Sequence, residues 1–142
     1  MALGTATGCA HLVILHDPLS ASEHRDLGVV YESKGQFDLA ANEYHRSLRL
    51  DPTRSAVRVN LGNVEAARGK WSRAEKCYRR ALTDSVTNAD AMNNLAVALL
   101  KQDRHLEEAR SLAERAVAAG GERDSLYRAT LAELRARQDG RP

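Results

Sequence analysis

The chain has 142 residues, of which 28% are charged, and its net charge at pH 7 is +2. This length suits a single domain, and the charge content, with only three prolines and few aromatic residues, is typical of a soluble helical protein rather than a disordered or membrane-spanning one. No block of like charges and no basic helix with interleaved aromatic residues occurs, so the sequence does not favour a nucleic-acid partner.

Residues 1–20 differ in composition from the rest of the chain. They contain a run of aliphatic side chains, namely Leu12, Val13, Ile14 and Leu15. The run is too short for a membrane span, which needs about 20 apolar residues. Because the residue before Pro18 is pushed toward extended geometry, we expect residues 1–20 to form an extended arm. An apolar run left in water is an aggregation hazard, so it should be buried on its own chain or on a neighbouring copy.

Residues 6–9 resemble the end of a bacterial lipoprotein signal, in which a small residue precedes the cysteine that receives the lipid. Here Gly8 precedes Cys9. A complete export signal also has a positively charged start and an apolar stretch, and neither precedes Ala6 in the sequence as written. Two interpretations stay open. Either the start is truncated and Cys9 is lipidated in a bacterial envelope, or the similarity is accidental and Cys9 is an exposed thiol of a cytoplasmic protein.

Helical spacing of apolar residues begins after the arm. Ser20 offers N-cap chemistry for a first helix from about Ser22 to Lys34, which Gly35 ends. A second helix opens at Phe37 and stops before Pro52, because proline cannot continue a helix beyond its first turn. The pattern then starts again.

The chain repeats itself with a period of 34 residues. The corresponding residues are Leu27, Gly28, Ala40, Tyr44 and Ser47, then Leu61, Gly62, Ala74, Tyr78 and Ala81, and then, with one inserted residue, Leu95, Ala96, Ala109, Ala113 and Ala116. Such a period, with a leucine and a small residue in a first helix and alanine and aromatic positions in a second, resembles the tetratricopeptide repeat family. The resemblance implies an all-α, right-handed solenoid built from helical hairpins.

The resemblance also divides the chain. It implies an arm at 1–20, repeats at 21–54, 55–88 and 89–122, and a C-terminal segment at 123–142. The third repeat has one extra residue near 106, and we expect a local distortion at that turn. By this numbering His105 stands where Phe37 and Trp71 stand in the first two repeats.

Two glycines lie inside predicted helices. Glycine at Gly28 and Gly62 costs about 1 kcal/mol relative to alanine, so it needs a reason. In a tetratricopeptide hairpin the reason is close approach of the two helices, with Tyr44 or Tyr78 filling the space beside the glycine. The alanine at the same place in the third repeat obeys the same demand for a small residue.

The C-terminal segment 123–142 predicts one amphipathic helix, with Leu126, Leu131 and Leu134 among charged residues. Repeat arrays need a terminal unit with a polar outer face. We therefore expect a capping helix or a truncated fourth repeat, whose three leucines cover the predicted helices at 89–102 and 106–119.

No motif indicates catalysis. The five histidines do not share the i, i+4 spacing of a helical metal pair, the two cysteines form no CxxC motif, and no glycine-rich phosphate loop or nucleophile motif is present. We expect neither an enzyme nor a metal or cofactor site.

The resemblance implies a groove lined by the first helix of each repeat, with the sixth residue of the repeat facing it. Those residues are Asp26, Asn60 and Asn94, and the ninth residue of the second repeat adds Asn63. An amide offers both a donor and an acceptor, so this row can hold the backbone of an extended peptide. The alternative is a set of solvent-facing polar residues.

Some relatives use this groove to clamp the acidic C-terminus of chaperones. Arg25 and Asn60 fit the pattern of those relatives, whereas Val29, Asp90 and Asn94 do not. We therefore do not expect a carboxylate clamp, although Arg25 remains a candidate groove residue.

Three functions stay open. The first is an interaction scaffold that binds an extended segment of a protein partner. The second is a bacterial lipoprotein adaptor, anchored through Cys9, that assists assembly of an envelope or secretion structure. The third is a self-assembling subunit that forms oligomers or filaments through the arm or the solenoid ends. The row Asp26, Asn60 and Asn94 offers hydrogen bonds to an extended backbone, which favours insertion of residues 12–15 into a neighbouring copy.

Overall fold

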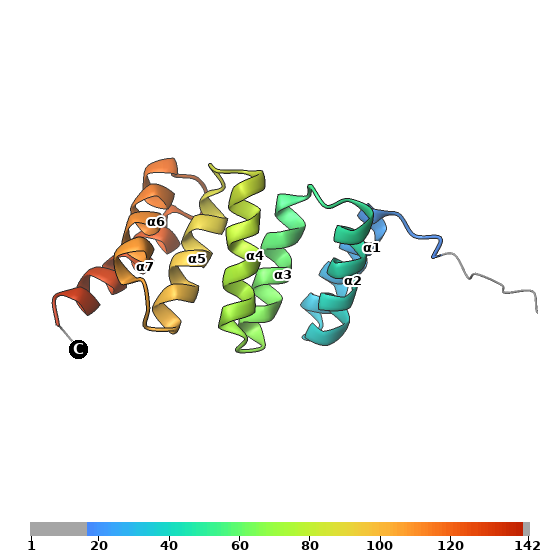
Figure 1. Cartoon of the computed structure of the whole chain (residues 1–142), viewed down its shortest axis with the longest axis horizontal. Coiled ribbons are helices and arrows are strands. Elements are labelled where there is room, and N and C mark those ends of the chain that lie inside the picture. Colours follow the sequence, from blue (N-terminus) through green and yellow to red (C-terminus); the bar gives the residue numbers. More distant parts are fainter. Residues whose placement is uncertain (1–16, 141–142) are drawn as a thin grey trace, which may run out of the picture.

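The computed structural model describes residues 17–140, and within that range the secondary structure is entirely helical (Figure 1). The helices are α1 (Ala21–Ser33), α2 (Phe37–Leu50), α3 (Ser55–Ala67), α4 (Trp71–Asp84), α5 (Ala89–Lys101), α6 (Leu106–Ala119) and α7 (Asp124–Gln138). The all-α fold class is confirmed. Of the predicted arm, residues 1–16 lie outside the described residues, and the exact limits of the repeats stay a prediction. No described helix has both the length and the apolar character needed to cross a membrane.

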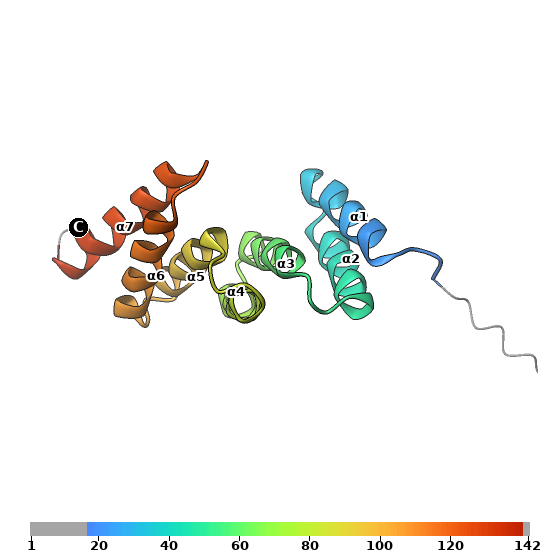
Figure 2. The same ribbon diagram turned by 90° about the horizontal axis from the view of Figure 1, so that it is seen from above.

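Consecutive helices pair into the hairpins α1–α2, α3–α4 and α5–α6, and α7 packs on the last of them. The backbones of the first helices also come close to one another, α1 to α3, α3 to α5 and α5 to α7, whereas the backbones of the second helices α2, α4 and α6 stay farther apart. Figure 2 shows the result, an arc with the first helices on one side and the second helices on the other. Because the first helices are closer together, they form the inner face of the solenoid.

The start of α1 and the turns inside the hairpins follow from local sequence. Ser20 and Glu23 form a capping box, in which the Glu23 amide donates to Ser20 Oγ and the Ser20 amide donates to Glu23 Oε2. Gly35 and Gly69 stand just after the first helices of hairpins one and two, with φ of 70° and 72°. Only glycine adopts this left-handed geometry without steric cost, so the two turns are alike.

The third hairpin turns differently, and one prediction about it is wrong. Asp103 takes the place of the turn glycine with φ of 50°, and His105 adopts φ of 50° as the extra residue. Leu106, not His105, therefore occupies the place of Phe37 and Trp71, and it packs against the core while His105 is exposed. The inserted residue thus lies before Leu106. His105, the second left-handed residue of the turn, lengthens it by one position, so that the core-facing residues of α6 match those of α2 and α4.

Close approach of a tyrosine ring explains why glycine stands at Gly28 and Gly62 despite its cost to helix stability. A Cβ atom at Gly28 would lie 2.5 Å from Cε1 of Tyr44, and one at Gly62 would lie 2.8 Å from Cδ1 of Tyr78. Real Cβ atoms do not approach other atoms so closely, so each tyrosine ring needs the missing side chain. In the third hairpin both partners are alanines, Ala96 and Ala113, and both are fully buried.

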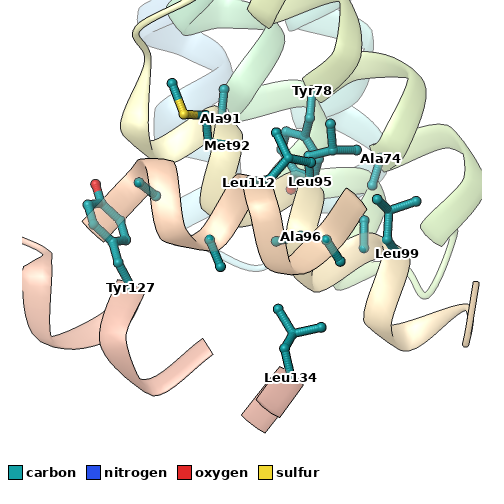
Figure 3. Packing of buried hydrophobic residues seen from close by; sticks show 14 of the residues in the cluster. Ala74, Tyr78, Ala91, Met92, Leu95, Ala96, Leu99, Leu112, Tyr127 and Leu134 are labelled. Atoms are coloured by element: carbon teal, nitrogen blue, oxygen red, sulfur yellow. The ribbon is translucent and has the colours of Figure 1, made fainter. Parts of the chain in front are cut away.

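The apolar core is divided into two clusters. One joins α3 to α7 and includes Tyr78, Leu95, Leu99 and Leu112 (Figure 3). The other, smaller cluster lies between the first hairpin and α3 and is centred on Tyr44. The two clusters divide at α3, which supplies Val59 to the first and Val57, Leu61 and Val64 to the second, and Cys77 of α4 packs against the second.

The C-terminal helix α7 covers the last hairpin, but with one residue different from the prediction. Leu131 and Leu134 are buried in the core, as is Tyr127, whereas Leu126 is 49% exposed. Figure 3 shows Tyr127 and Leu134 directed toward α5 and α6. Residues spaced by four and three positions share one helix face, and Leu126 lies one residue off that face.

A charged cluster ties the third turn to α4. Glu75 on α4 is 7% exposed and accepts hydrogen bonds from Arg79 Nε at 2.9 Å, from Gln102 Nε2 at 3.0 Å and from Arg104. Burial alone would raise the pKa of Glu75, but the hydrogen bonds from Arg104, Arg79 and Gln102 outweigh it and lower the pKa to about 2. The carboxylate is therefore charged at neutral pH and stabilises the folded state.

We expect Glu75→Gln to destabilise the protein at neutral pH by about 1–3 kcal/mol, because the neutral amide loses charge-assisted bonds. A lowered pKa stabilises the fold above the unfolded-state pKa and ceases to do so as the pH falls through the folded-state value. The stability of the parent should thus decline between about pH 4.5 and pH 2, and the variant should decline less. Urea unfolding across this range measures both effects. Glu133→Gln, at an exposed site on α7, is the control, and an equal effect of both variants would contradict the role of the cluster.

Candidate functional site

A small hollow lies where the first helices α3 and α5 meet on the inner face. Its volume is about 220 Å³, and it is lined by Asn63, Ala66, Trp71, Tyr78, Asn94 and Val97. Asn63 and Asn94 come from the two first helices, and the aromatic residues come from α4. The hollow thus combines two amides with an apolar and aromatic wall.

Hydrogen bonds join the polar side chains of this hollow. The Tyr78 hydroxyl donates to Asn63 Oδ1 at 2.9 Å, and Asn94 Nδ2 donates to the same oxygen at 2.9 Å. Burial of the ring raises the pKa of Tyr78, so its hydroxyl stays protonated and donates. Among the described residues, the amide nitrogen of Asn63 has no acceptor, which leaves its N–H groups available to a ligand.

The first hairpin arranges its tyrosine differently. Val29 stands at the position of Asn63, so the Tyr44 hydroxyl donates instead to Glu32 Oε2 at 2.6 Å. Burial, followed by this bond to a carboxylate, raises the pKa of Tyr44, and the Asn60 amide opposes the shift from the neighbouring helix. Asn60 therefore lies by Tyr44 much as Asn94 lies by the Asn63–Tyr78 pair one repeat later.

Asn93 is a polar residue that the sequence analysis missed. Its side chain is 1% exposed, its Nδ2 lies 3.4 Å from Asn94 Oδ1, and its own Oδ1 has no hydrogen-bond partner in the described chain. A buried carbonyl without a partner costs about 1–3 kcal/mol. Two adjacent asparagines within a helix, where asparagine is a poor helix former, were the available signal.

Arg25 and Asp26, the candidate residues on α1, make no hydrogen bond to Asn60, Asn63 or Asn94. Arg25 donates to Asp26 Oδ1 from Nε at 2.8 Å and from Nη2 at 2.6 Å, and this pair is exposed on α1. Both side chains are largely exposed, so the Arg25 charge stays accessible to solvent, and the ion pair contributes little to stability. Cys9 and the apolar run at 12–15 lie outside the described residues.

The described part of the predicted arm begins at Asp17. Its carboxylate lies 3.2 Å from Nε2 of His24, and Nδ1 of the same ring lies 2.7 Å from Glu43 Oε2. His24 is buried, so these contacts hold the chain just before α1 against both helices of the first hairpin. No group of three or more His, Cys, Asp or Glu in the described chain is placed to hold a metal ion.

Known sequences similar to this chain contain tetratricopeptide repeats or match it over a small part of their length. A sequence model described as "Tetratricopeptide repeat" matches residues 25–84 and 59–124. The chain is 40% identical over 60 residues to Tetratricopeptide repeat protein 8 of Homo sapiens, which is 42% of this chain and 11% of that protein. It is 34% identical over 111 residues to Cellulose synthase operon protein C of Xanthomonas axonopodis pv. citri (strain 306), which is 75% of this chain and 7% of that protein. The chain thus spans a small part of the length of these curated relatives.

Solved structures share the fold. The first TPR of Spaghetti (RPAP3) bound to HSP90 peptide SRMEEVD has a TM-score of 0.79 at 20% identity, covering 89% of this chain and 98% of that chain. The Sgt2 TPR domain from Aspergillus fumigatus has a TM-score of 0.76 at 15% identity, covering 84% and 79%. The Yersinia enterocolitica type III secretion chaperone SycD, in complex with a peptide of the translocator YopD, has a TM-score of 0.75 at 17% identity, covering 82% and 93%.

Proposed function

Because the chain belongs to the tetratricopeptide repeat family, we propose that it is a non-catalytic interaction scaffold that binds an extended segment of a protein partner on its inner face. The observation that supports this most is the hollow between α3 and α5. There two amides and a tyrosine hydroxyl are held in place by hydrogen bonds, and N–H groups remain available beside an apolar wall.

The architecture suits an extended ligand. Side chains from neighbouring first helices lie next to one another along the inner face, so a peptide backbone crossing several helices meets one amide after another. An amide can donate to a backbone carbonyl and accept from a backbone N–H, whatever the ligand sequence. Two of the structural neighbours, described above with bound peptides, belong to the same fold and make a peptide ligand reasonable for this chain.

The apolar wall adds selectivity to this backbone recognition. Trp71 and Val97 line the hollow beside the two asparagines, so an apolar ligand side chain fits there. Arg25 and Asp26 lie on α1, at the end of the inner face far from α7 in Figure 2. The lipid anchor at Cys9 and assembly through residues 12–15 stay predictions, because both lie outside the described residues.

We expect the triple variant Asn60→Ala, Asn63→Ala, Asn94→Ala to bind peptide ligands at least about tenfold more weakly than the parent. Each lost hydrogen bond contributes about 0.5–1.5 kcal/mol, and about 1.4 kcal/mol is a tenfold change in Kd. Peptides selected from a random displayed library on the parent protein serve as probes, and fluorescence polarisation measures their affinity.

The matched control is Asn42→Ala, which removes an exposed amide from α2 on the outer side. Helicity measured by circular dichroism should be unchanged in all variants. Asn94→Ala alone is a second variant that leaves the Tyr78–Asn63 bond in place. Equal affinity of the triple variant and the parent would show that these asparagines are solvated residues without a binding role.

A further inference from the structure

The outer side of the solenoid has a second cavity, in the gap between α2 and α4. Its volume is about 340 Å³, larger than that of the inner hollow. Its apolar lining includes Leu48 on α2, Leu61 on α3 and Cys77 on α4. Burial raises the pKa of Cys77 to about 11, so the thiol is neutral at physiological pH and acts as a small apolar wall.

Basic side chains surround this apolar lining. Arg49 and His45 extend from α2, and Lys76 and Arg80 extend from α4, and all four residues are exposed. Arg49, Lys76 and Arg80 have no ion pair with any described residue, so no carboxylate within residues 17–140 offsets their charges. The cavity therefore has an apolar interior and an uncompensated positive rim.

A fifth basic residue, Arg58, forms part of the wall. Its side chain is 15% exposed, and its Nε donates to Asp84 Oδ2 at 2.7 Å. It also donates to the carbonyl oxygen of Pro52. Asp84 therefore offsets the charge of Arg58 and of no other basic residue of the cavity. The nearby carboxylate of Glu65 is paired with Arg68 at 3.0 Å. The carboxylates around the cavity leave the charges of its rim in excess.

The equivalent space one repeat later, between α4 and α6, is filled by side chains. Between α4 and α6, Leu112 stands at the position of Cys77 and Met92 at that of Arg58, and both are buried in the core. Arg79 bridges the gap to Glu108 with bonds of 2.6 and 2.9 Å. Between α2 and α4 the corresponding positions are His45 and Arg73, which cannot attract each other when charged. The outer cavity is thus specific to this pair of repeats.

We propose that this cavity binds an acidic protein segment that places one apolar side chain between α2 and α4 and its carboxylates against Arg49, Lys76 and Arg80. An apolar side chain removed from water in a preformed pocket supplies affinity, and complementary charge at the rim supplies specificity. A single-stranded nucleic acid fits less well, because no tryptophan, tyrosine or phenylalanine lines the cavity as a platform for base stacking. The cavity is distinct from the inner face, so the two sites can be occupied together.

The test uses a fluorescein-labelled peptide with one central leucine and two aspartates on each side. We expect saturable binding by fluorescence polarisation at about 0.05 M salt, and a loss of at least about fivefold in affinity at about 0.5 M salt. A peptide with asparagines in place of the aspartates should bind at least about tenfold more weakly, and one with alanine in place of leucine at least about fivefold more weakly.

Two variants of the protein locate the site. Lys76→Glu with Arg80→Glu should weaken binding at least about tenfold, because it reverses charges at the rim. Cys77→Leu should fill the cavity, as Leu112 does one repeat later, and weaken binding at least about fivefold. The matched control is Ser111→Glu with Arg115→Glu, which alters the equivalent positions on α6 and should leave affinity unchanged.

Several outcomes would overturn the proposal. No saturable binding up to about 1 mM peptide, well above the range of specific complexes, is one. Equal affinity of the parent and the Lys76→Glu, Arg80→Glu variant is another, and since these residues are exposed, that variant should fold. A labelled oligothymidine that binds more tightly than the peptide, and loses affinity in the same variant, would assign the cavity to nucleic acid instead. Asn94→Ala should not alter peptide binding here, which separates this site from the inner face.

Discussion

Gly62→Ala is expected to destabilise the protein by about 1–3 kcal/mol, although alanine is the better helix former by about 1 kcal/mol. The new Cβ atom would lie 2.8 Å from both Cδ1 and Cζ of Tyr78. The tyrosine ring cannot move aside, because it is 2% exposed and its hydroxyl is bonded to Asn63. Urea unfolding monitored by circular dichroism measures the change in the free energy of unfolding.

A double-mutant cycle identifies the cause. Tyr78→Ala alone should cost about 3–5 kcal/mol, because it leaves a large void in the core. In that background Gly62→Ala should no longer destabilise and should instead stabilise the helix, since Ala96 and Ala113 form this same small pair in the third hairpin. Additive effects of the two substitutions would refute the steric explanation.

Leu134→Ala is expected to destabilise the protein by about 2–5 kcal/mol, because Leu134 has no solvent exposure and packs where α7 covers the last hairpin. Leu126→Ala removes an identical side chain from the same helix, but Leu126 is 49% exposed, so the expected change is within about 0.5 kcal/mol. Denaturant unfolding of both variants beside the parent measures the difference.

Both substitutions replace leucine by alanine on α7, so each controls for the change in helix propensity that the other brings. A large effect at Leu134 alone would establish that α7 stabilises the array through one buried face. Similar small effects at both positions would mean that α7 contributes little to stability and does not cap the solenoid.

Tyr44 and Tyr78 contribute both to the stability of the core and to the polar groups of the inner face. Each ring sets the distance between the helices of its hairpin through the glycine that it covers, and each hydroxyl reaches a polar group on a first helix. A change in Tyr78 therefore alters both the core and the amide pair at Asn63. The buried part of the side chain and its polar end have different roles, as is common for tyrosine.

The sequence by itself determined the helices, their order and the small residues at Gly28 and Gly62. These features follow from local spacing and from a repeat in which each hairpin contacts only its neighbours, so a periodic pattern is enough to predict them. Within α7, the same periodicity allowed two choices of face, and burial of Tyr127 rather than Leu126 was decided by packing against α5 and α6.

The tertiary structure decided where an insertion falls and which distant side chains meet. One extra residue between α5 and α6 can precede or follow the packing position, and only the backbone geometry at Asp103 and His105 distinguishes the two. Asn63 and Asn94 were predicted for the inner face from the family pattern, but their shared bond network with Tyr78 depends on the distance between α3 and α5. The basic rim of the outer cavity was not visible in the sequence, because its charges are dispersed along α2 and α4 and gather only when the two hairpins pack side by side.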